Sequence, residues 1–237
     1  MKNVSVIVLA AGSGSRFGQA KQFLDLTPGV RLVDAAVDTA FTVTESVILV
    51  LPPQHIWEGR RVDATVVGGS SRLGSVAAGL TALPGDQEVV VVHDAAHPLA
   101  SRATFLDVIE AILDGADAAV PVLSLGDVVK RQDHQGRLTT VGRDGLGLAQ
   151  VPMAFSTTAL LSAHAAPSIT DTPYWEDSML IERDGGIVVA VPGSSRNIHV
   201  VTPEDLSVAR ALAVQREGTG KIRFVRVFRL RQVFRKD

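Results

Sequence analysis

The chain has 237 residues, a formal net charge of −2 and no cysteine. This length allows one substantial hydrophobic core, and the charge gives no whole-protein case for binding nucleic acid. Without cysteine, disulfides, thiolate nucleophiles and cysteine-ligated metals are excluded. No apolar run is long enough to cross a bilayer, and the first strand begins too early to leave room for a signal peptide. We therefore expect a cytoplasmic protein with no membrane partner.

The first 24 residues carry the clearest pattern. An apolar run over residues 5–9 stops at the turn AAGSGSR, which is typical of a buried parallel strand that ends in a ligand-binding loop at the edge of an α/β sheet. Small residues let backbone N–H groups approach an anion, and Arg16 and Lys21 add two positive charges. The turn matches neither a dinucleotide fingerprint nor a Walker loop. We interpret it as a nucleoside triphosphate site followed by an amphipathic helix; the alternative is an ordinary strand-to-helix connection.

Two later strands end in comparable turns. Residues 62–67 lead into GGSSRLGS, where Ser75 is a candidate ligand contact or, alternatively, a helix N-cap. Residues 88–92 form a second apolar run that leads to Asp94 and two alanines. A carboxylate at the mouth of a central strand suits a nucleotide ribose or its magnesium ion, although a helix cap and a turn former are equally good interpretations of Asp94 alone.

The remaining elements alternate between strands and helices. This alternation predicts one doubly wound α/β domain with a mostly parallel sheet. The expected helices are residues 32–41, 76–83, 105–113, 159–165, 177–182 and 202–213, and the further strands are residues 46–51, 116–122 and 186–191.

Two segments differ from this core. Residues 124–148 are charged and punctuated by glycine, which predicts a protruding β-hairpin arm that gains stability by packing on a second subunit. Residues 217–237 form a basic C-terminal tail, which contains seven Lys and Arg residues from Lys221 onwards. We assign this tail no function. The predicted division is therefore one main domain over residues 1–216, arm included, and a tail over residues 217–237.

Six motifs in order give the chain a specific resemblance. They are LAAGSGSRFG, AKQFLDL, GGSSRLGSVAAGL, VHDAAHP, GRDGLGLAQVPMAF and SSRNIHVVTPEDL. Together they resemble the 2-C-methyl-D-erythritol 4-phosphate cytidylyltransferase family, which is related to ribitol-5-phosphate cytidylyltransferases. The resemblance implies a Rossmann-like homodimer with an interlocking arm. It also implies transfer of CMP from CTP to a sugar-alcohol phosphate, in isoprenoid precursor synthesis, with magnesium as cofactor and pyrophosphate as the second product.

The resemblance also implies roles for single residues. Arg16 and Lys21 correspond to the family's catalytic basic pair, and Arg143 corresponds to its acceptor-phosphate arginine, supplied by the partner's arm. Asp94 corresponds to the ribose and metal carboxylate. The residues expected to hold the nucleotide are Ala10, Ala11, Gly12, Gly69, Ser75, Asp94 and Ala95.

Departures from the family pattern are concentrated at the acceptor side. His97 replaces an arginine, His199 replaces a lysine and Val151 replaces a threonine. These changes remove permanent charges and a hydroxyl. They leave open the same chemistry on ribitol 5-phosphate, a cyclitol phosphate or another acceptor, and also an inactive CTP-binding paralogue. The two histidines either bind the acceptor phosphate as imidazolium or simply face solvent or accept backbone hydrogen bonds.

Overall fold

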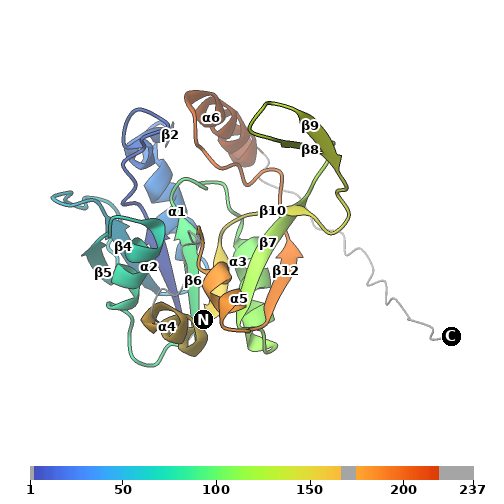
Figure 1. The fold of residues 1–237 in the computed structure, drawn as a ribbon. Helices are drawn as coiled ribbons and strands as arrows, with labels where there is room; N and C mark the ends of the chain where they lie inside the picture. The colour runs from blue at the N-terminus through green and yellow to red at the C-terminus, as the bar shows by residue number, and fades with distance from the viewer. Residues whose placement is uncertain (1–2, 167–174, 219–237) are drawn as a thin grey trace.

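The computed structural model describes residues 3–166 and 175–218. Within these ranges the chain folds around an eight-stranded sheet with the order β10-β7-β11-β6-β1-β4-β5, and β12 also pairs with β7 (Figure 1). The strands are β1 (Val4–Leu9), β4 (Ser46–Leu51), β5 (Ala64–Val67), β6 (Val89–Asp94), β7 (Ala118–Ser124), β10 (Gly147–Ala149), β11 (Met153–Ser156) and β12 (Val188–Pro192).

The centre of the sheet is parallel. β1 lies between β4 and β6 and is parallel to both, and β12 runs parallel to β7. The strands β10 and β11 are antiparallel to their neighbours. In the pairing of β1 with β6, Leu9 is opposite Asp94, so the two strands end side by side. The loops that follow them therefore emerge at the same edge of the sheet.

Successive side chains of a strand point to opposite faces of the sheet, so the apolar strands present apolar side chains on both faces. Helices cover both of these faces. On one face Val6 and Val8 of β1 pack with α1 (Leu32–Ala40) and α3 (Arg102–Leu113). On the other face Ile7 belongs to a buried cluster that also contains side chains of α2 (Arg72–Leu80), α4 (Thr157–Ala165) and α5 (Ser178–Arg183). The result is the predicted doubly wound, Rossmann-like α/β fold.

The segment after Lys21 differs from its prediction. Instead of an amphipathic helix, the chain forms the short 3-10 turn η1 (Lys21–Phe23) and then the hairpin strands β2 (Asp25–Thr27) and β3 (Val30–Arg31). Pro28 and Gly29 make the turn of this hairpin. A helix could not continue through this position, because proline lacks the N–H donor and clashes with the preceding helical turn. The last helix, α6 (Pro203–Gly218), packs against this region through Leu26, Leu206 and their neighbours.

The arm is a separate two-stranded sheet. The strands β8 (Val129–Gln132) and β9 (Leu138–Val141) pair antiparallel, and the chain then returns to the main sheet through β10. The hairpin projects from the upper right of the body in Figure 1. This confirms the protruding arm of the predicted fold. The division at residue 216 stays a prediction, because most of the tail (residues 219–237) lies outside the described residues.

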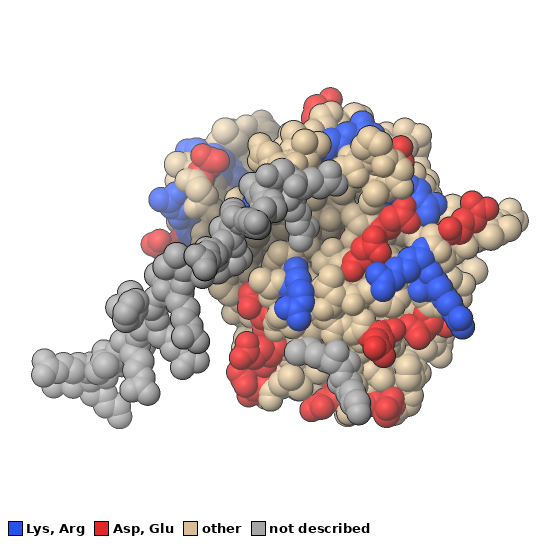
Figure 2. Space-filling model, turned by 180° about the vertical axis from the view of Figure 1, so that it is seen from behind, with Lys and Arg blue, Asp and Glu red and all other residues tan. Residues whose placement is uncertain are grey.

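Within residues 3–166 and 175–218, no helix combines the length and apolar character needed to cross a membrane. Figure 2 shows the molecule from behind, where basic and acidic side chains are interspersed over the described surface. That face therefore presents both signs of charge side by side.

Gly79 of α2 provides a test of the packing between this helix and β1. A Cβ atom at position 79 would lie 2.6 Å from Cγ2 of Ile7, which is closer than real Cβ contacts. Gly→Ala in a helix ordinarily stabilises by about 1 kcal/mol. Here we expect Gly79→Ala to lower the free energy of unfolding by about 1–3 kcal/mol, because the core is overpacked.

Urea denaturation of Gly79→Ala measures this effect, and Gly79→Ala combined with Ile7→Ala is the control that removes the clash. If the clash with Ile7 is the cause, Gly79→Ala should lower the free energy of unfolding by less in the Ile7→Ala background than in the original chain. A Gly79→Ala variant more stable than the original chain would contradict the described contact.

Candidate active site

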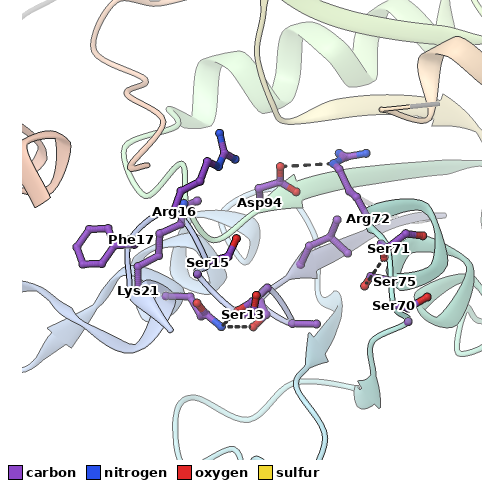
Figure 3. Close-up of a pocket in the computed structure, with 18 residues that line it drawn as sticks. Ser13, Ser15, Arg16, Phe17, Lys21, Ser70, Ser71, Arg72, Ser75 and Asp94 are labelled. Carbon is purple, nitrogen blue, oxygen red and sulfur yellow. Dashed lines mark hydrogen bonds and ion pairs between the residues drawn. The ribbon is translucent and has the colours of Figure 1, made fainter. Parts of the chain in front are cut away.

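A cavity of about 480 Å³ lies at the carboxyl edge of β1 and β6. Figure 3 shows Arg16 and Lys21 on one side of it, the α2 end with Arg72 and Ser75 on the other, and Asp94 between them. The volume is in the range of small-molecule sites. The structure thus brings together eight of the residues expected from the sequence: Ala10, Ala11, Gly12, Arg16, Lys21, Gly69, Ser75 and Asp94.

The first loop is held in place by a buried side chain. The Nε2 amide of Gln22 donates to the carbonyl oxygens of Ala10 (2.7 Å) and Gly12 (2.8 Å). These bonds tie the start of the loop to the turn that carries Lys21. Because the carbonyls are engaged by Gln22, their orientation is fixed, and this pre-organises the loop before any ligand binds. Gln22 was not predicted from the sequence, where its only signal is its position next to Lys21.

The second glycine-rich turn packs directly on the first. A Cβ atom at Gly68 would clash with the Cβ of Ala11 and lie 2.9 Å from Oγ of Ser75, so only glycine permits this approach. The N-cap of α2 is Ser71, which accepts from the N–H of Gly74 at 3.0 Å. Ser75 donates to the carbonyl of Ser71 instead, so its interpretation as the N-cap was wrong. The N-terminus of α2 adds its positive end to the cavity wall.

Arg16 and Lys21 are two neighbouring cations at the cavity. Among the described residues neither makes an ion pair with a carboxylate. Burial, together with the nearby Arg16 guanidinium, lowers the pKa of the Lys21 ammonium, although Asp94 and Asp205 oppose the shift. Two neighbouring positive charges repel each other, and an anion bound between them would relieve that repulsion. The arrangement is therefore a site for a highly charged anion.

Asp94 carries the negative charge of the cavity. Of the described residues that line it, only Asp94 is acidic. Its Oδ2 lies 3.6 Å from Nε of Arg72. Burial alone would raise the pKa of Asp94, but Arg72 and His97 outweigh burial and lower it. The N-cap of α3 is Ser101, so the interpretation of Asp94 as a helix cap was wrong. An ionised carboxylate facing the cavity can accept from a hydroxyl or bind a divalent cation.

His97 and His199 stack next to Asp94, with ring centroids 4.5 Å apart. The buried His97 ring contacts Oδ1 of Asn197 through Nδ1 at 3.3 Å, and the Nδ2 of Asn197 donates to the carbonyl of Val151 at 2.6 Å. Because Nδ2 of Asn197 is the donor to Val151, Oδ1 is the acceptor, which assigns the proton to Nδ1 of His97.

The pKa values of both histidines lie below that of a free imidazole. Burial, His97 and Lys21 lower the pKa of His199 to about 4, and burial lowers the pKa of His97 as well. His199 is therefore neutral at pH 7 in the protein without ligand, and the hypothesis that the two histidines bind the acceptor phosphate as imidazolium stays a prediction. His97 does not face solvent, because its ring is buried.

Five expected residues lie outside the cavity lining: Ala95, His97, Arg143, Val151 and His199. Arg143 follows β9 on the arm, where its Nη1 donates to the carbonyl of Gly126 at 2.8 Å. Ala95 is buried and donates its N–H to the carbonyl of Leu9 at 3.0 Å, while the next residue, Ala96, lines the cavity. The single chain therefore joins both catalytic candidates to the nucleotide candidates but does not bring Arg143 to them.

Comparison with known proteins identifies the family. A sequence model of the family described as 2-C-methyl-D-erythritol 4-phosphate cytidylyltransferase (IspD) matches residues 4–215. The chain belongs to this family. A protein of that description from Pelotomaculum thermopropionicum is 37% identical over 234 residues, which cover 92% of this chain and 97% of that relative. Membership of the IspD family agrees with the resemblance found in the six motifs.

Two further relatives define the extent of the likeness. A bifunctional enzyme IspD/IspF from Nitratidesulfovibrio vulgaris is 38% identical over 226 residues, covering 87% of this chain but only 57% of that relative. The chain therefore spans little more than half the length of such bifunctional relatives. The crystal structure of the IspD enzyme from Thermus thermophilus matches with a TM-score of 0.78 and 32% identity, covering 90% of this chain and 99% of that chain.

His93 precedes Asp94 in β6 and is a buried polar residue. Its ring is fully buried and packs edge-on to Phe105, with centroids 5.1 Å apart. Within the described part of the chain neither ring nitrogen has a hydrogen-bond partner. Burial, with His97 nearby, lowers the pKa of His93 from 6.5 to about 3. His93 is therefore a neutral core residue and not a catalytic acid or base at neutral pH.

This shift predicts a pH dependence of stability. Between pH 6.5 and pH 3 the unfolded chain binds a proton at position 93 that the folded chain does not. Stability should therefore fall as the pH decreases through this window, by up to about 1.4 kcal/mol per pH unit. In His93→Leu we expect the slope of the unfolding free energy against pH to decrease by that amount, as measured by urea denaturation from pH 7 to 4.

Val91→Ala is the control, because it weakens the same core without removing a titrating group. It should lower stability about equally at every pH and leave the slope as it is. A slope in His93→Leu that equals the slope of the original chain would show that His93 does not titrate as described.

Proposed function

We propose that the protein transfers CMP from CTP to a sugar-alcohol phosphate, most specifically 2-C-methyl-D-erythritol 4-phosphate, with release of pyrophosphate. The observation that carries this proposal is the pair of cations, Arg16 and Lys21, held without carboxylate partners among the described residues and facing Asp94 across a nucleotide-sized cavity. Membership of the IspD family supports this proposal, because the names of its relatives contain the acceptor and the cytidylyl group that is transferred. The product would be a precursor in isoprenoid synthesis.

The chemistry needs no general base from the protein. An ionised phosphate oxygen of the acceptor attacks the α-phosphorus of CTP, a new P–O bond forms, and the bond to the β-phosphate oxygen breaks so that pyrophosphate leaves. Arg16, Lys21 and the N–H groups of the first loop stabilise the charge that develops on the α-phosphate and the leaving group. Gln22 keeps that loop in position, which lowers the reorganisation needed in the transition state.

Magnesium is the proposed cofactor, and the donor set fits it. Mg²⁺ in such sites is usually held by one or two carboxylates with substrate phosphates and water. Asp94 is ionised, faces the cavity and would be the protein ligand. The described residues contain no group of three or more His, Asp or Glu that could hold a metal by themselves. When bound, the ion would neutralise phosphate charge during the transfer.

We also propose a homodimer formed through residues 124–148. Large apolar side chains of this region are exposed in the single chain: Val128, Leu138, Leu146 and Leu148. A two-stranded hairpin alone is marginally stable, so a second copy that covers these side chains would stabilise it. In this arrangement Arg143 would reach the acceptor phosphate of the other subunit. The proposal includes a cytoplasmic location, which suits a chain without cysteine, and no nucleic-acid partner.

The proposal is tested by pyrophosphate release with CTP, Mg²⁺ and a panel of acceptors. We expect release with 2-C-methyl-D-erythritol 4-phosphate, and little or none when CTP, acceptor or Mg²⁺ is omitted. Ribitol 5-phosphate and a cyclitol phosphate are the competing acceptors. A higher kcat/KM with either of them would reassign the acceptor, and CTP binding without turnover of any acceptor would support an inactive paralogue.

Lys21→Ala tests the proposed role of the cation pair. Removing one charge that acts on the transition state should lower kcat about 10²–10³-fold, by analogy with the loss of one oxyanion donor. The far-ultraviolet circular dichroism spectrum should be unchanged, because the Lys21 side chain has no ion-pair partner among the described residues. Arg61→Ala, on an exposed loop, is the matched control and should keep full activity. Full activity in Lys21→Ala would refute the assignment.

A further inference from the structure

Among the described residues that line the cavity, Arg72 is the one charged residue to which the proposed chemistry gives no role. It is the first residue of α2, directly after the cap Ser71. Its guanidinium lies between two carboxylates that come from distant elements. Nε is 3.6 Å from Oδ2 of Asp94 at the end of β6, and Nη1 is bonded to Oδ2 of Asp177, which precedes α5. Figure 3 shows Arg72 reaching towards Asp94 from the α2 side.

The far end of this chain of charges is anchored in the protein interior. The Asp177 side chain has no exposed surface. Its second oxygen, Oδ1, is 2.9 Å from Nε2 of His164 in α4. Asp177 is thus held by one cation and one imidazole, and it in turn fixes the direction of the Arg72 guanidinium. Planar arginine suits this geometry, because its separate N–H groups can address two carboxylates at once.

A purely structural ion pair explains this arrangement poorly. The Nη2 group of Arg72 is buried and has no hydrogen-bond partner among the described residues, which costs stability. Replacing a buried ion pair by neutral groups is often neutral or stabilising. What the pair does provide is a fixed positive charge next to Asp94. That charge lowers the pKa of Asp94 against the effect of burial.

We propose that Arg72, anchored by Asp177, is a positioning residue that holds the Asp94 carboxylate in the orientation that binds CTP with its magnesium ion. This inference rests on the proposed function, since it assigns a task to Asp94 in nucleotide binding. Arg72 acts through Asp94 and does not itself contact the reacting atoms. Loss of Arg72 therefore weakens CTP binding only as long as Asp94 is present.

The test is a double-mutant cycle on CTP affinity, measured by calorimetry with CTP and Mg²⁺. To keep Asp177 from being left as an unpaired charge, the Arg72 change is made as Arg72→Met with Asp177→Asn, here termed the neutralised pair. In the original background the neutralised pair should weaken CTP binding about tenfold or more. In an Asp94→Asn background, adding the neutralised pair should change the affinity less than about twofold.

Thermal unfolding separates this role from a structural one. Arg72→Met alone leaves Asp177 without its cation and should lower the unfolding temperature, whereas the neutralised pair should recover much of the loss. Recovery of stability without recovery of CTP affinity supports positioning. Arg60→Met is the matched control, because it removes an exposed arginine paired with Asp38 and should leave CTP affinity unchanged.

Three outcomes overturn the proposal. An equal loss of CTP affinity with and without Asp94 would show that Arg72 does not act through Asp94. Original CTP affinity in the neutralised pair would show that the ion pair is only structural. Both of these leave the proposed function intact, because the original protein still binds CTP. If the original protein binds no CTP, both the positioning role and the proposed function fall.

Discussion

The parallel pairing of β1 between β4 and β6 is the constraint on which the site depends. It sets Leu9 opposite Asp94, so the glycine-rich loop after β1 and the carboxylate at the end of β6 share one edge of the sheet. The pairing of β4 with β5 sets Leu51 opposite Val67 and brings the second glycine-rich turn to the same edge. A shift of one residue in any of these pairings would turn the buried side chains to the wrong face, and the packed helices prevent it.

Around this edge, polar groups are fixed before a ligand binds. Gln22 engages two loop carbonyls, Ser71 caps α2, and Arg72 connects the cavity wall to the buried Asp177. Arg16 and Lys21, in contrast, are held close together without carboxylate partners among the described residues. Such a site is costly when empty and favourable when a polyanion fills it. This is the electrostatic pre-organisation that phosphoryl transfer requires.

Much of the fold followed from the sequence because its signals are local. The apolar runs of β1, β4 and β6 and the turns after them predicted both the parallel sheet and the edge that carries the cavity. Four strands escaped prediction. The hairpin of β2 and β3 is too short for its periodicity to be distinguished from a helix. The antiparallel strands β10 and β11 depend on their neighbours in the sheet and not on their own composition.

The site was less predictable where function depends on partners distant in the chain. Arg72 and Asp177 are 105 residues apart, and no spacing rule connects them. The stacking of His97 on His199 likewise needed the folded chain, and it is this proximity, with burial, that keeps His199 neutral. Ser75 and Asp94 were correctly placed at the cavity, but their alternative roles as helix caps failed because Ser71 and Ser101 are the caps.

A crystal structure of the protein with CTP and Mg²⁺ tests the central claim most directly. The account predicts that the triphosphate lies against the loop of residues 10–18, within hydrogen-bond distance of both Arg16 and Lys21, with the nucleoside between Asp94 and the turn of residues 68–75. A triphosphate bound elsewhere, or a complex in which both cations point into solvent, would contradict it.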